Sequence, residues 1–359
     1  MGSTVSIEID SFRSDLSVRY WDLPPWGHPL SQCIMPLFMG IGSRLIPVGT
    51  AFIAGDGVKF VLTAAHNVTE VFKYEQRLRH LLTADTLPEA LALKEVSFWL
   101  LYQHQEGAQE FPKLFLWPLE SFNGAPPTDA IIGSAQSQTL FPTLSFPLSF
   151  AVPLHGERVR SVGYTNFLPS EGLDFEDVKS NTFNWMENYS HSFRVVEGCV
   201  EKIFGRRFTS KFVDGPCFTI DAEIFHGQSG GPVFDDCGFI KGVNSAGASH
   251  FFDAPSSIIS LLYPLLANNV SSGVSLAPNF RINAELPLIH WIERGAIKTD
   301  GSEQNIVFDP VDGKFSISAV IPNGQDAFTF DDFSGFQKAL PATRKQTRTG
   351  FRFRRNEKN

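Results

Sequence analysis

The sequence contains a serine whose neighbours suit nucleophilic catalysis. Ser229 lies in the segment HGQSGGPVF, among glycines and just before an apolar run. A serine hydroxyl is a poor nucleophile until a base takes its proton, and the tetrahedral intermediate that it forms needs hydrogen-bond donors directed at the oxyanion. Glycine at 227 allows a backbone conformation that other residues avoid, so the amides of Gly227 and Ser229 can converge on one oxygen. The segment therefore predicts a nucleophile beside its own oxyanion hole.

A base and a carboxylate lie upstream in contexts that suit these two roles. His66 ends the segment TAAH, whose small residues let the imidazole ring reach across a cleft. Asp129 follows the loop APPT and precedes the apolar run AIIGS, so we expect it to be buried where a strand begins. A buried carboxylate of this kind fixes the tautomer of a catalytic histidine and stabilises the imidazolium ion.

Together these motifs resemble a known family. TAAH, TDAIIG and GQSGGPVF, in the order His, Asp, Ser, are similar to the chymotrypsin-like (trypsin superfamily) serine proteases. TIDAEIFHGQSGGPVFDDCGFIKGVNSAG most resembles the Deg, or high-temperature-requirement, branch of that family. The resemblance covers roughly residues 35 to 250. It implies an all-β protein with two six-stranded β-barrels and an active site in the cleft between them.

The resemblance also implies roles for individual residues. His66 would be the general base and then the general acid, Asp129 would orient it, and Ser229 would be the nucleophile. The amides of Gly227 and Ser229 would form the oxyanion hole.

Further residues match the substrate-binding positions of the family. Ser245, Ala246 and Gly247 match the strand segment that pairs with the substrate backbone, and the Ser245 side chain would support Asp129. These matches imply that a peptide substrate binds as an extended strand.

The side-chain preference of the site stays open at this point. Glu223 stands six residues before Ser229, at the family's position at the base of the primary specificity pocket. A carboxylate there would favour Lys or Arg side chains, and the alternative is that Glu223 points away from the pocket. His226 is expected at the pocket rim, as a substrate contact or as a solvated loop residue.

Departures from the family pattern matter as well. Gln228 stands where secreted trypsins have an aspartate that pairs with a freshly cleaved N-terminus, so activation by such cleavage is not expected. Asn67 stands where those trypsins have a cysteine. No counterpart of the Deg branch's downstream peptide-binding (PDZ) module is evident after residue 300.

The organisation of the chain follows from strand, turn and proline signals. We expect a protease domain at 31–296, with the boundary between its barrels near 140–156, where prolines are frequent. A helical insertion is expected after His66, over residues 68–96, and a more helical stretch before residue 296. Residues 1–30 form an N-terminal extension, and 297–359 form a C-terminal extension with a hairpin and a basic tail. The tail is expected either to be solvated and disordered or to contact an acidic partner or RNA.

Composition limits the classes of function. Hydrophobic residues make up 43% of the 359 residues, 34 are phenylalanine, and the net charge is -8, which favours a strand-rich globular protein and argues against nucleic acid as its main partner. The four cysteines have no metal-ligand spacing and predict free thiols in a reducing compartment. With no secretion signal or membrane span evident in the sequence, we expect a soluble, cytoplasmic protein that needs no cofactor or metal.

Three functions remain to be weighed. The leading one is a serine endopeptidase, whose partners are protein or peptide substrates and a possible regulator that binds the terminal extensions. The second is a non-catalytic, protease-like module that binds peptides. The third is an esterase of the α/β-hydrolase type, because residues 227–231 also fit the G-x-S-x-G elbow, but that elbow requires a helix directly after Ser229.

Overall fold

The computed structural model describes the greater part of the two expected barrels. The described residues are 19–55, 60–69, 96–104, 111–123, 128–135, 145–180, 182–209, 214–247, 255–277, 280–309, 314–317 and 350–352.

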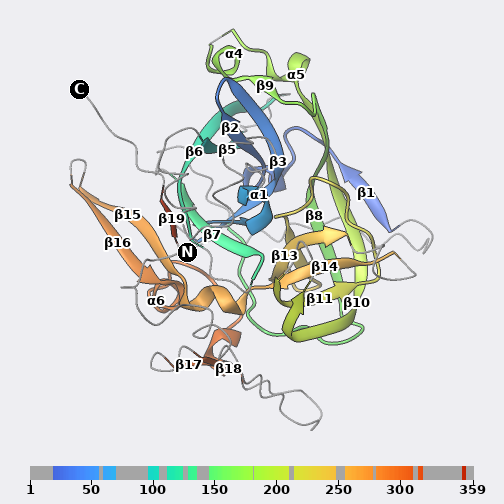
Figure 1. Cartoon of the computed structure of the whole chain (residues 1–359), viewed down its shortest axis with the longest axis vertical. Helices are drawn as coiled ribbons and strands as arrows, with labels where there is room; N and C mark the ends of the chain where they lie inside the picture. Colours follow the sequence, from blue (N-terminus) through green and yellow to red (C-terminus); the bar gives the residue numbers. More distant parts are fainter. Residues whose placement is uncertain are drawn as a thin grey trace.

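The first half of the chain forms a closed barrel, coloured blue to teal in Figure 1. Its strands are β2 (Ile34–Ile41), β3 (Arg44–Ala54), β4 (Phe60–Ala64), β5 (Val96–His104), β6 (Lys113–Asn123) and β7 (Ala130–Ala135). The order of pairing is β6-β5-β2-β3-β4-β7, and the pairing of β6 with β7 closes the ring. All of these pairings are antiparallel.

The second half forms another closed barrel, coloured green to yellow in Figure 1. Its strands are β8 (Arg158–Leu168), β10 (Ser190–Thr209), β11 (Asp214–Ile220), β12 (Pro232–Asp235), β13 (Ile240–Gly247) and β14 (Ser257–Leu261). The order is β10-β11-β14-β13-β12-β8, closed by the pairing of β8 with β10. The prediction of an all-β fold with two six-stranded barrels is thus confirmed.

Two hydrophobic cores explain why the first-barrel strands are apolar without clear alternation. In β2, Met35, Leu37 and Met39 pack into a cluster made of first-barrel residues and α1. Ile34 and Phe38, on the other face, pack into a larger cluster shared with the second barrel. Since successive side chains of a strand point to opposite faces, burial of both faces requires a continuous apolar run.

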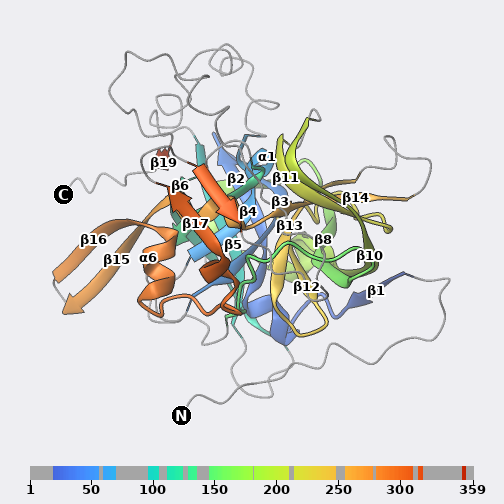
Figure 2. The same cartoon turned by 90° about the horizontal axis from the view of Figure 1, so that it is seen from below.

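Further elements complete the described structure (Figures 1 and 2). They are β1 (Tyr20–Leu23), η1 (Pro29–Gln32), α1 (Ala65–Thr69), β9 (Leu173–Asp174), α4 (Phe175–Lys179), α5 (Trp185–Asn188), η3 (Tyr263–Ala267), β15 (Asn269–Ala277), β16 (Phe280–Pro287), α6 (Leu288–Glu293), η4 (Ser302–Asn305), β17 (Ile306–Asp309), β18 (Lys314–Ile317) and β19 (Gly350–Arg352). β1 pairs with β10 at the edge of the second barrel. β17 and β18 pair with each other, as the sequence signal for a hairpin suggested.

The helical stretch expected before residue 296 is mostly wrong. Among the described residues of this stretch only η3 and α6 are helical, while β15 and β16 form a long antiparallel hairpin that projects from the barrels in Figures 1 and 2. Cross-strand pairing outweighs the local propensity that suggested helix. Residues 165–192 contain the end of β8, the elements β9, α4 and α5, and the start of β10, and the buried side chains of Phe175 and Trp185 anchor this segment.

Other expectations meet the structure only in part. The helical insertion expected over 68–96 falls mainly outside the described residues. Within the basic tail, residues 350–352 form β19, which pairs with β6. The expectation of a disordered tail is therefore wrong for these three residues. The chain passes from the first barrel to the second between Ala135 and Arg158.

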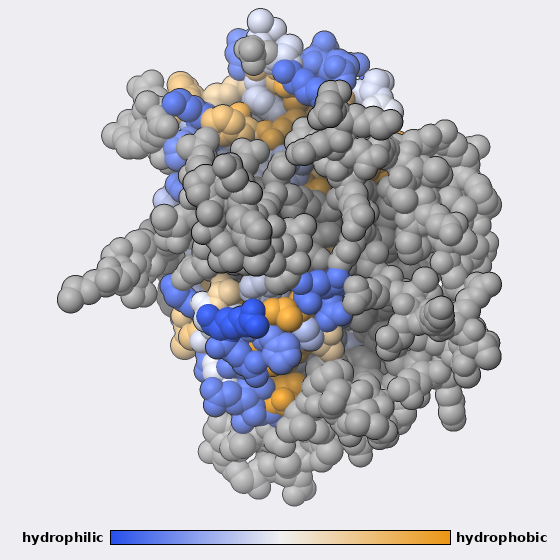
Figure 3. Space-filling model, turned by 90° about the vertical axis from the view of Figure 1, so that its left-hand side faces the viewer, coloured by the Kyte–Doolittle hydropathy of each residue, from blue (hydrophilic) through white to orange (hydrophobic). Residues whose placement is uncertain are grey.

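Surface and thiol features are ordinary for a globular protein. On the face in Figure 3, hydrophilic and hydrophobic residues lie intermixed in small groups among the described residues. No helix in the described ranges is long and apolar enough to cross a membrane. All four cysteines are free thiols, and Cys33 and Cys217 are buried.

Candidate active site

His66 and Asp129 form a tight pair at one end of the first barrel. His66 lies on α1, directly after β4, and Asp129 directly precedes β7, which pairs with β4. The His66 Nδ1 atom lies 2.9 Å from Asp129 Oδ2, and the backbone amide of His66 donates to Asp129 Oδ1 over 3.0 Å. The Asp129 side chain is 4% exposed and that of His66 is 20% exposed. Since a carboxylate can only accept, Nδ1 carries the proton and Nε2 is left as the basic nitrogen.

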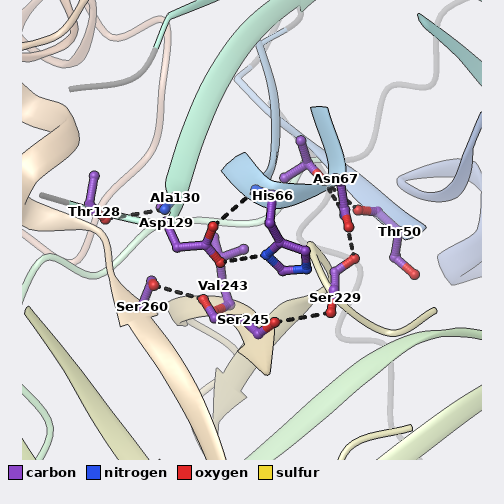
Figure 4. Close-up of polar contacts among 11 residues, drawn as sticks. Thr50, His66, Asn67, Thr128, Asp129, Ala130, Ser229, Val243, Ser245 and Ser260 are labelled. Carbon is purple, nitrogen blue, oxygen red and sulfur yellow. Dashed lines mark hydrogen bonds and ion pairs between the residues drawn. The ribbon is translucent and has the colours of Figure 1, made fainter. Parts of the chain in front are cut away.

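Ser229 approaches this pair from the second barrel. In Figure 4 the imidazole ring of His66 lies between the carboxylate of Asp129 and the side chain of Ser229. The Ser229 hydroxyl donates a hydrogen bond to the backbone carbonyl of Ser245 over 3.0 Å. The structure therefore brings the three predicted residues together, with the Ser229 hydroxyl bonded to the Ser245 carbonyl.

Hydrogen bonds to the backbone carbonyl groups of residues 225–229 hold the loop that carries Ser229. Each carbonyl of residues 225 to 229 accepts at least one hydrogen bond. The donors are Gln228 N for residue 225, Thr165 Oγ1 for 226, Thr50 Oγ1 for 227, Gly231 N and Asn244 Nδ2 for 228, and Thr50 N and Asn67 Nδ2 for 229. By contrast, no described residue accepts a hydrogen bond from the amides of Gly227 or Ser229. These two amides are the donors predicted for the oxyanion hole, and they are left available for a ligand.

Close packing restricts the glycines of the loop. Gly230 has φ +88°, and a Cβ atom there would lie 2.0 Å from the Thr50 carbonyl oxygen and 2.2 Å from Thr63 Oγ1. Gly231 has no room either, since its Cβ would lie 2.1 Å from the Val162 carbonyl oxygen. The two glycines after the serine are thus required by contact between the loop and both barrels.

Three polar residues that sequence reasoning missed connect the barrels to the loop. Thr50, on β3, donates to the Gly227 carbonyl over 2.8 Å, and its own amide donates to the Ser229 carbonyl over 2.8 Å. Asn67, next to His66, donates through Nδ2 to that same Ser229 carbonyl over 2.8 Å. Asn244, on β13, donates to the Gln228 carbonyl over 3.1 Å. Asn67 is the only one with a sequence signal, since it adjoins the candidate base.

The expected role of the Ser245 side chain is wrong. Its hydroxyl lies 2.7 Å from the Ser260 hydroxyl and 3.4 Å from the Val243 carbonyl, and no described contact joins it to Asp129. The cause is an irregularity in the pairing of β13 with β14, where the register shifts between Asn244 and Ala246. The shift turns the side chain toward β14.

The other substrate-binding candidates lie around the same loop. Ala246 and Gly247 pair with β14 on one edge, and none of the described strands pairs with them on the other edge, so an extended peptide could add there. Glu223 is exposed, and one of its carboxylate oxygens lies 4.0 Å from the position of a Cβ on Gly247. His226 is exposed as well, at the start of the loop.

Burial changes the pKa of groups behind the site. Burial lowers the pKa of His191 to about 4, although its hydrogen bond to the Pro25 carbonyl acts in the opposite direction. Burial also raises the pKa of Tyr164, on β8, well above its ordinary value, with a smaller contribution from Cys33. These groups are neutral at pH 7 and form part of the packing between the barrels. In the described part of the chain, no cluster of His, Cys, Asp and Glu side chains could hold a metal ion.

Comparison with known proteins decides the family. The model of the trypsin-like peptidase domain matches residues 49–243, which is more than half of the chain. The chain belongs to the trypsin-like peptidase domain family. Membership of this family supports a serine-type peptidase that acts on proteins or peptides. No curated protein sequence matches the chain.

Solved structures with a similar fold are distant in sequence. The apo MamO protease domain from Magnetospirillum magneticum is 16% identical, with a TM-score of 0.40 over 65% of this chain and 93% of that chain. The active form of the Rv3671c protease from M. tuberculosis is 15% identical, with a TM-score of 0.40 over 68% of this chain and 88% of that chain. Deg5 is 15% identical, with a TM-score of 0.38 over 60% of this chain and 80% of that chain.

The esterase alternative fails on the local fold. The G-x-S-x-G elbow requires a helix directly after the nucleophile. Ser229 is followed instead by a turn and then by β12, which pairs with β13 and β8.

Proposed function

We propose that this trypsin-like peptidase is a serine endopeptidase that works through an acyl-enzyme intermediate. The observation that carries the proposal is the His66–Asp129 pair at 2.9 Å, which presents its remaining nitrogen toward the loop of Ser229. Residues 31–296 would form the protease domain, to which the terminal extensions add the strands β1 and β19.

The proposed reaction starts when Ser229 Oγ attacks the scissile carbonyl carbon. The hydroxyl proton moves to His66 Nε2, and Asp129 stabilises the imidazolium that results. The amides of Gly227 and Ser229 donate to the oxyanion, and no described protein group competes for either donor. His66 then returns the proton to the leaving amine as the C–N bond breaks, and a water molecule hydrolyses the acyl-enzyme by the same steps in reverse.

A second candidate is a non-catalytic, peptide-binding module. One observation favours it: the described hydrogen bond of the Ser229 hydroxyl goes to Ser245 and not to His66. Catalytic hydrogen bonds in ligand-free enzymes are often loose and tighten only with substrate. Because two amides of the same loop have no acceptor among the described residues, the endopeptidase is the better-supported function.

The deciding experiment labels the purified full-length protein with a fluorophosphonate probe, which reacts only with an activated serine. We expect labelling of the wild type, none of Ser229→Ala, and a loss of at least about a thousandfold in rate for His66→Ala, because without its base the serine hydroxyl is unactivated. His290→Ala is the matched control, since His290 is exposed on α6 and paired with Glu293. Wild-type protein that folds but does not label would favour the binding module.

A further inference from the structure

The orientation of two peptide groups decides whether the oxyanion hole exists. The N–H of Gly227 belongs to the same planar unit as the carbonyl of His226, and the two point in opposite directions. The N–H of Ser229 is related in the same way to the carbonyl of Gln228. A donor that fixes either carbonyl therefore also fixes the opposing amide.

The two peptide groups are held very unequally. Two donors hold the Gln228 carbonyl, the amide of Gly231 over 2.9 Å and the Asn244 side chain over 3.1 Å. The His226 carbonyl has one described donor, the hydroxyl of Thr165, over 2.7 Å. As far as the described residues show, the direction of the Gly227 amide thus depends on one side-chain hydrogen bond, from Thr165.

Glycine makes the first of these peptide groups easy to invert. Gly227 has φ +96°, and a glycine residue accepts positive and negative φ about equally well. Inversion of the 226–227 peptide needs only changes in ψ of residue 226 and φ of Gly227. The backbone therefore gives little resistance of its own to a flip that would turn the Gly227 amide away from the oxyanion.

Thr165 is well placed to prevent that flip. It lies on β8, is 2% exposed, and its backbone pairs with Ser192 of β10. Its neighbour Tyr164 donates its amide to Thr50 Oγ1, which in turn donates to the Gly227 carbonyl. The loop is thus seated on a rigid part of the barrel wall.

We propose that Thr165 is a positioning residue for the oxyanion hole: its hydroxyl holds the His226 carbonyl and so directs the Gly227 amide at the developing negative charge. The proposal rests on the proposed peptidase function, because only that reaction uses the amide. The described hydrogen bond of the Thr165 hydroxyl goes to the His226 carbonyl, so Thr165 would act through the peptide group that it holds. Its removal should slow the chemical step and leave substrate binding unchanged.

The test is Thr165→Val, which removes the hydroxyl and keeps the shape of the side chain. We expect kcat on a peptide substrate to fall at least about tenfold, with the loss of one whole oxyanion donor, about 10²- to 10³-fold, as its upper bound. KM should stay within about twofold. Thr165→Ser restores the hydroxyl, and its kcat should return to within about threefold of the wild type.

Thr219→Val is the matched control. Thr219, on β11, is 0% exposed, and its hydroxyl has no hydrogen-bond partner within the described residues. The same substitution there removes a buried hydroxyl without touching the loop, and kcat should not change. If kcat of Thr165→Val equals that of Thr219→Val to within about twofold, the proposal is wrong.

Crystal structures of the wild type and Thr165→Val supply a readout that does not depend on activity. In the wild type we expect the 226–227 peptide group to keep the orientation in which the His226 carbonyl accepts from Thr165. In at least part of the variant molecules we expect this peptide group to be inverted. The same orientation in both would overturn the proposal, even for a protein that no probe labels. If the probe does not label the wild type but the 226–227 peptide group is inverted only in Thr165→Val, the result would count against the peptidase function and not against the role of Thr165.

Discussion

Gln228, the residue before the candidate nucleophile, is held by hydrogen bonds within the folded chain. Its side chain is fully buried, and both ends of its amide are used: Oε1 accepts from the Phe225 amide over 2.8 Å, and Nε2 donates to the Arg194 carbonyl over 3.1 Å. The residue before the serine is therefore satisfied within the folded chain. That activation needs no ion pair with a cleaved N-terminus stays a prediction from the sequence.

Gln228→Glu should destabilise the protein and slow fluorophosphonate labelling. The carboxylate would bury a charge and place an oxygen against the Arg194 carbonyl, at a cost of about 2 kcal/mol or more. Burial raises the pKa of such a carboxyl, and its protonated form can donate to the carbonyl again. The stability deficit, measured by urea unfolding at several pH values, should therefore shrink as the pH falls from 7 to 5.

Gln103→Glu is the control for this prediction. Gln103, on β5, is 1% exposed and has the same pattern, with Oε1 accepting from the Gly27 amide and Nε2 donating to the Pro25 carbonyl. It should lose similar stability and keep its labelling rate at temperatures where it stays folded. Equal loss of labelling in both variants would show that Gln228 acts through global stability only.

At the scale of elements, β1 binds to the strand and the loop that carry the site. Asp22 forms a two-contact ion pair with Arg194 of β10, at 2.6 and 3.0 Å. The Arg194 guanidinium lies 4.7 Å from the Tyr20 ring centroid and 4.3 Å from that of Phe225. Phe225 begins the loop of Ser229, so contacts of the first described strand reach the oxyanion loop directly.

Arg194→Met should therefore lower both the stability and the labelling rate. The loss of the ion pair and ring contacts should cost about 1 kcal/mol, a modest figure because Asp22 is 46% exposed. The labelling rate should fall severalfold, because Phe225 loses the cation that covers its ring. Thermal unfolding and labelling kinetics measure the two effects.

The control is Arg160→Met, in which the arginine is similarly buried. The Arg160 side chain is 13% exposed, against 11% for Arg194, and it pairs with Glu197 and Asp236 away from the loop. A similar loss of stability with an unchanged labelling rate is expected. Identical labelling rates for the two variants would argue that β1 has no influence on the site.

At the scale of the whole molecule, an aromatic cluster lies between the barrels. His191 of β10 packs against Trp26, Tyr164 and Tyr189, and Tyr189 packs against Phe38 of the first barrel. Its Nε2 lies 2.9 Å from the Pro25 carbonyl, while Nδ1 is buried with no described hydrogen-bond partner. Protonation would therefore place an unsatisfied charge in the contact between the two halves.

This burial makes the stability of the fold depend on pH. The pKa of His191 is about 4 in the folded protein and about 6.5 in an unfolded chain, so between these values only the unfolded chain binds the proton. The contribution is fully present above pH 6.5 and is lost as the pH falls toward 4. We expect about 2 kcal/mol of this loss between pH 7 and pH 5.

Denaturant unfolding of the wild type and of His191→Phe separates this effect from other titrating groups. The variant keeps an aromatic ring and removes the proton-binding nitrogen. Its stability should fall by about 2 kcal/mol less than that of the wild type between pH 7 and pH 5. The same pH slope in both proteins would contradict the assignment.

Local chemistry explains what could be predicted from the sequence. Small residues precede His66, a proline-containing turn precedes Asp129, and glycines flank Ser229. These neighbours alone indicate a strand end or a tight loop. Thr50 and Asn67 contact the loop across 177 and 162 residues of sequence, and no local pattern indicates such a contact. Ser245 was misjudged because the strand register shifts beside it, and such a shift, which can redirect a side chain, cannot be read from the order of residues.

The hydrogen bond between the Ser229 hydroxyl and the Ser245 carbonyl has one more consequence. A peptide added beside β13 would bring its own N–H to that carbonyl and compete with the serine for it. Arrival of an extended backbone would then release the hydroxyl at the moment a scissile bond is in reach.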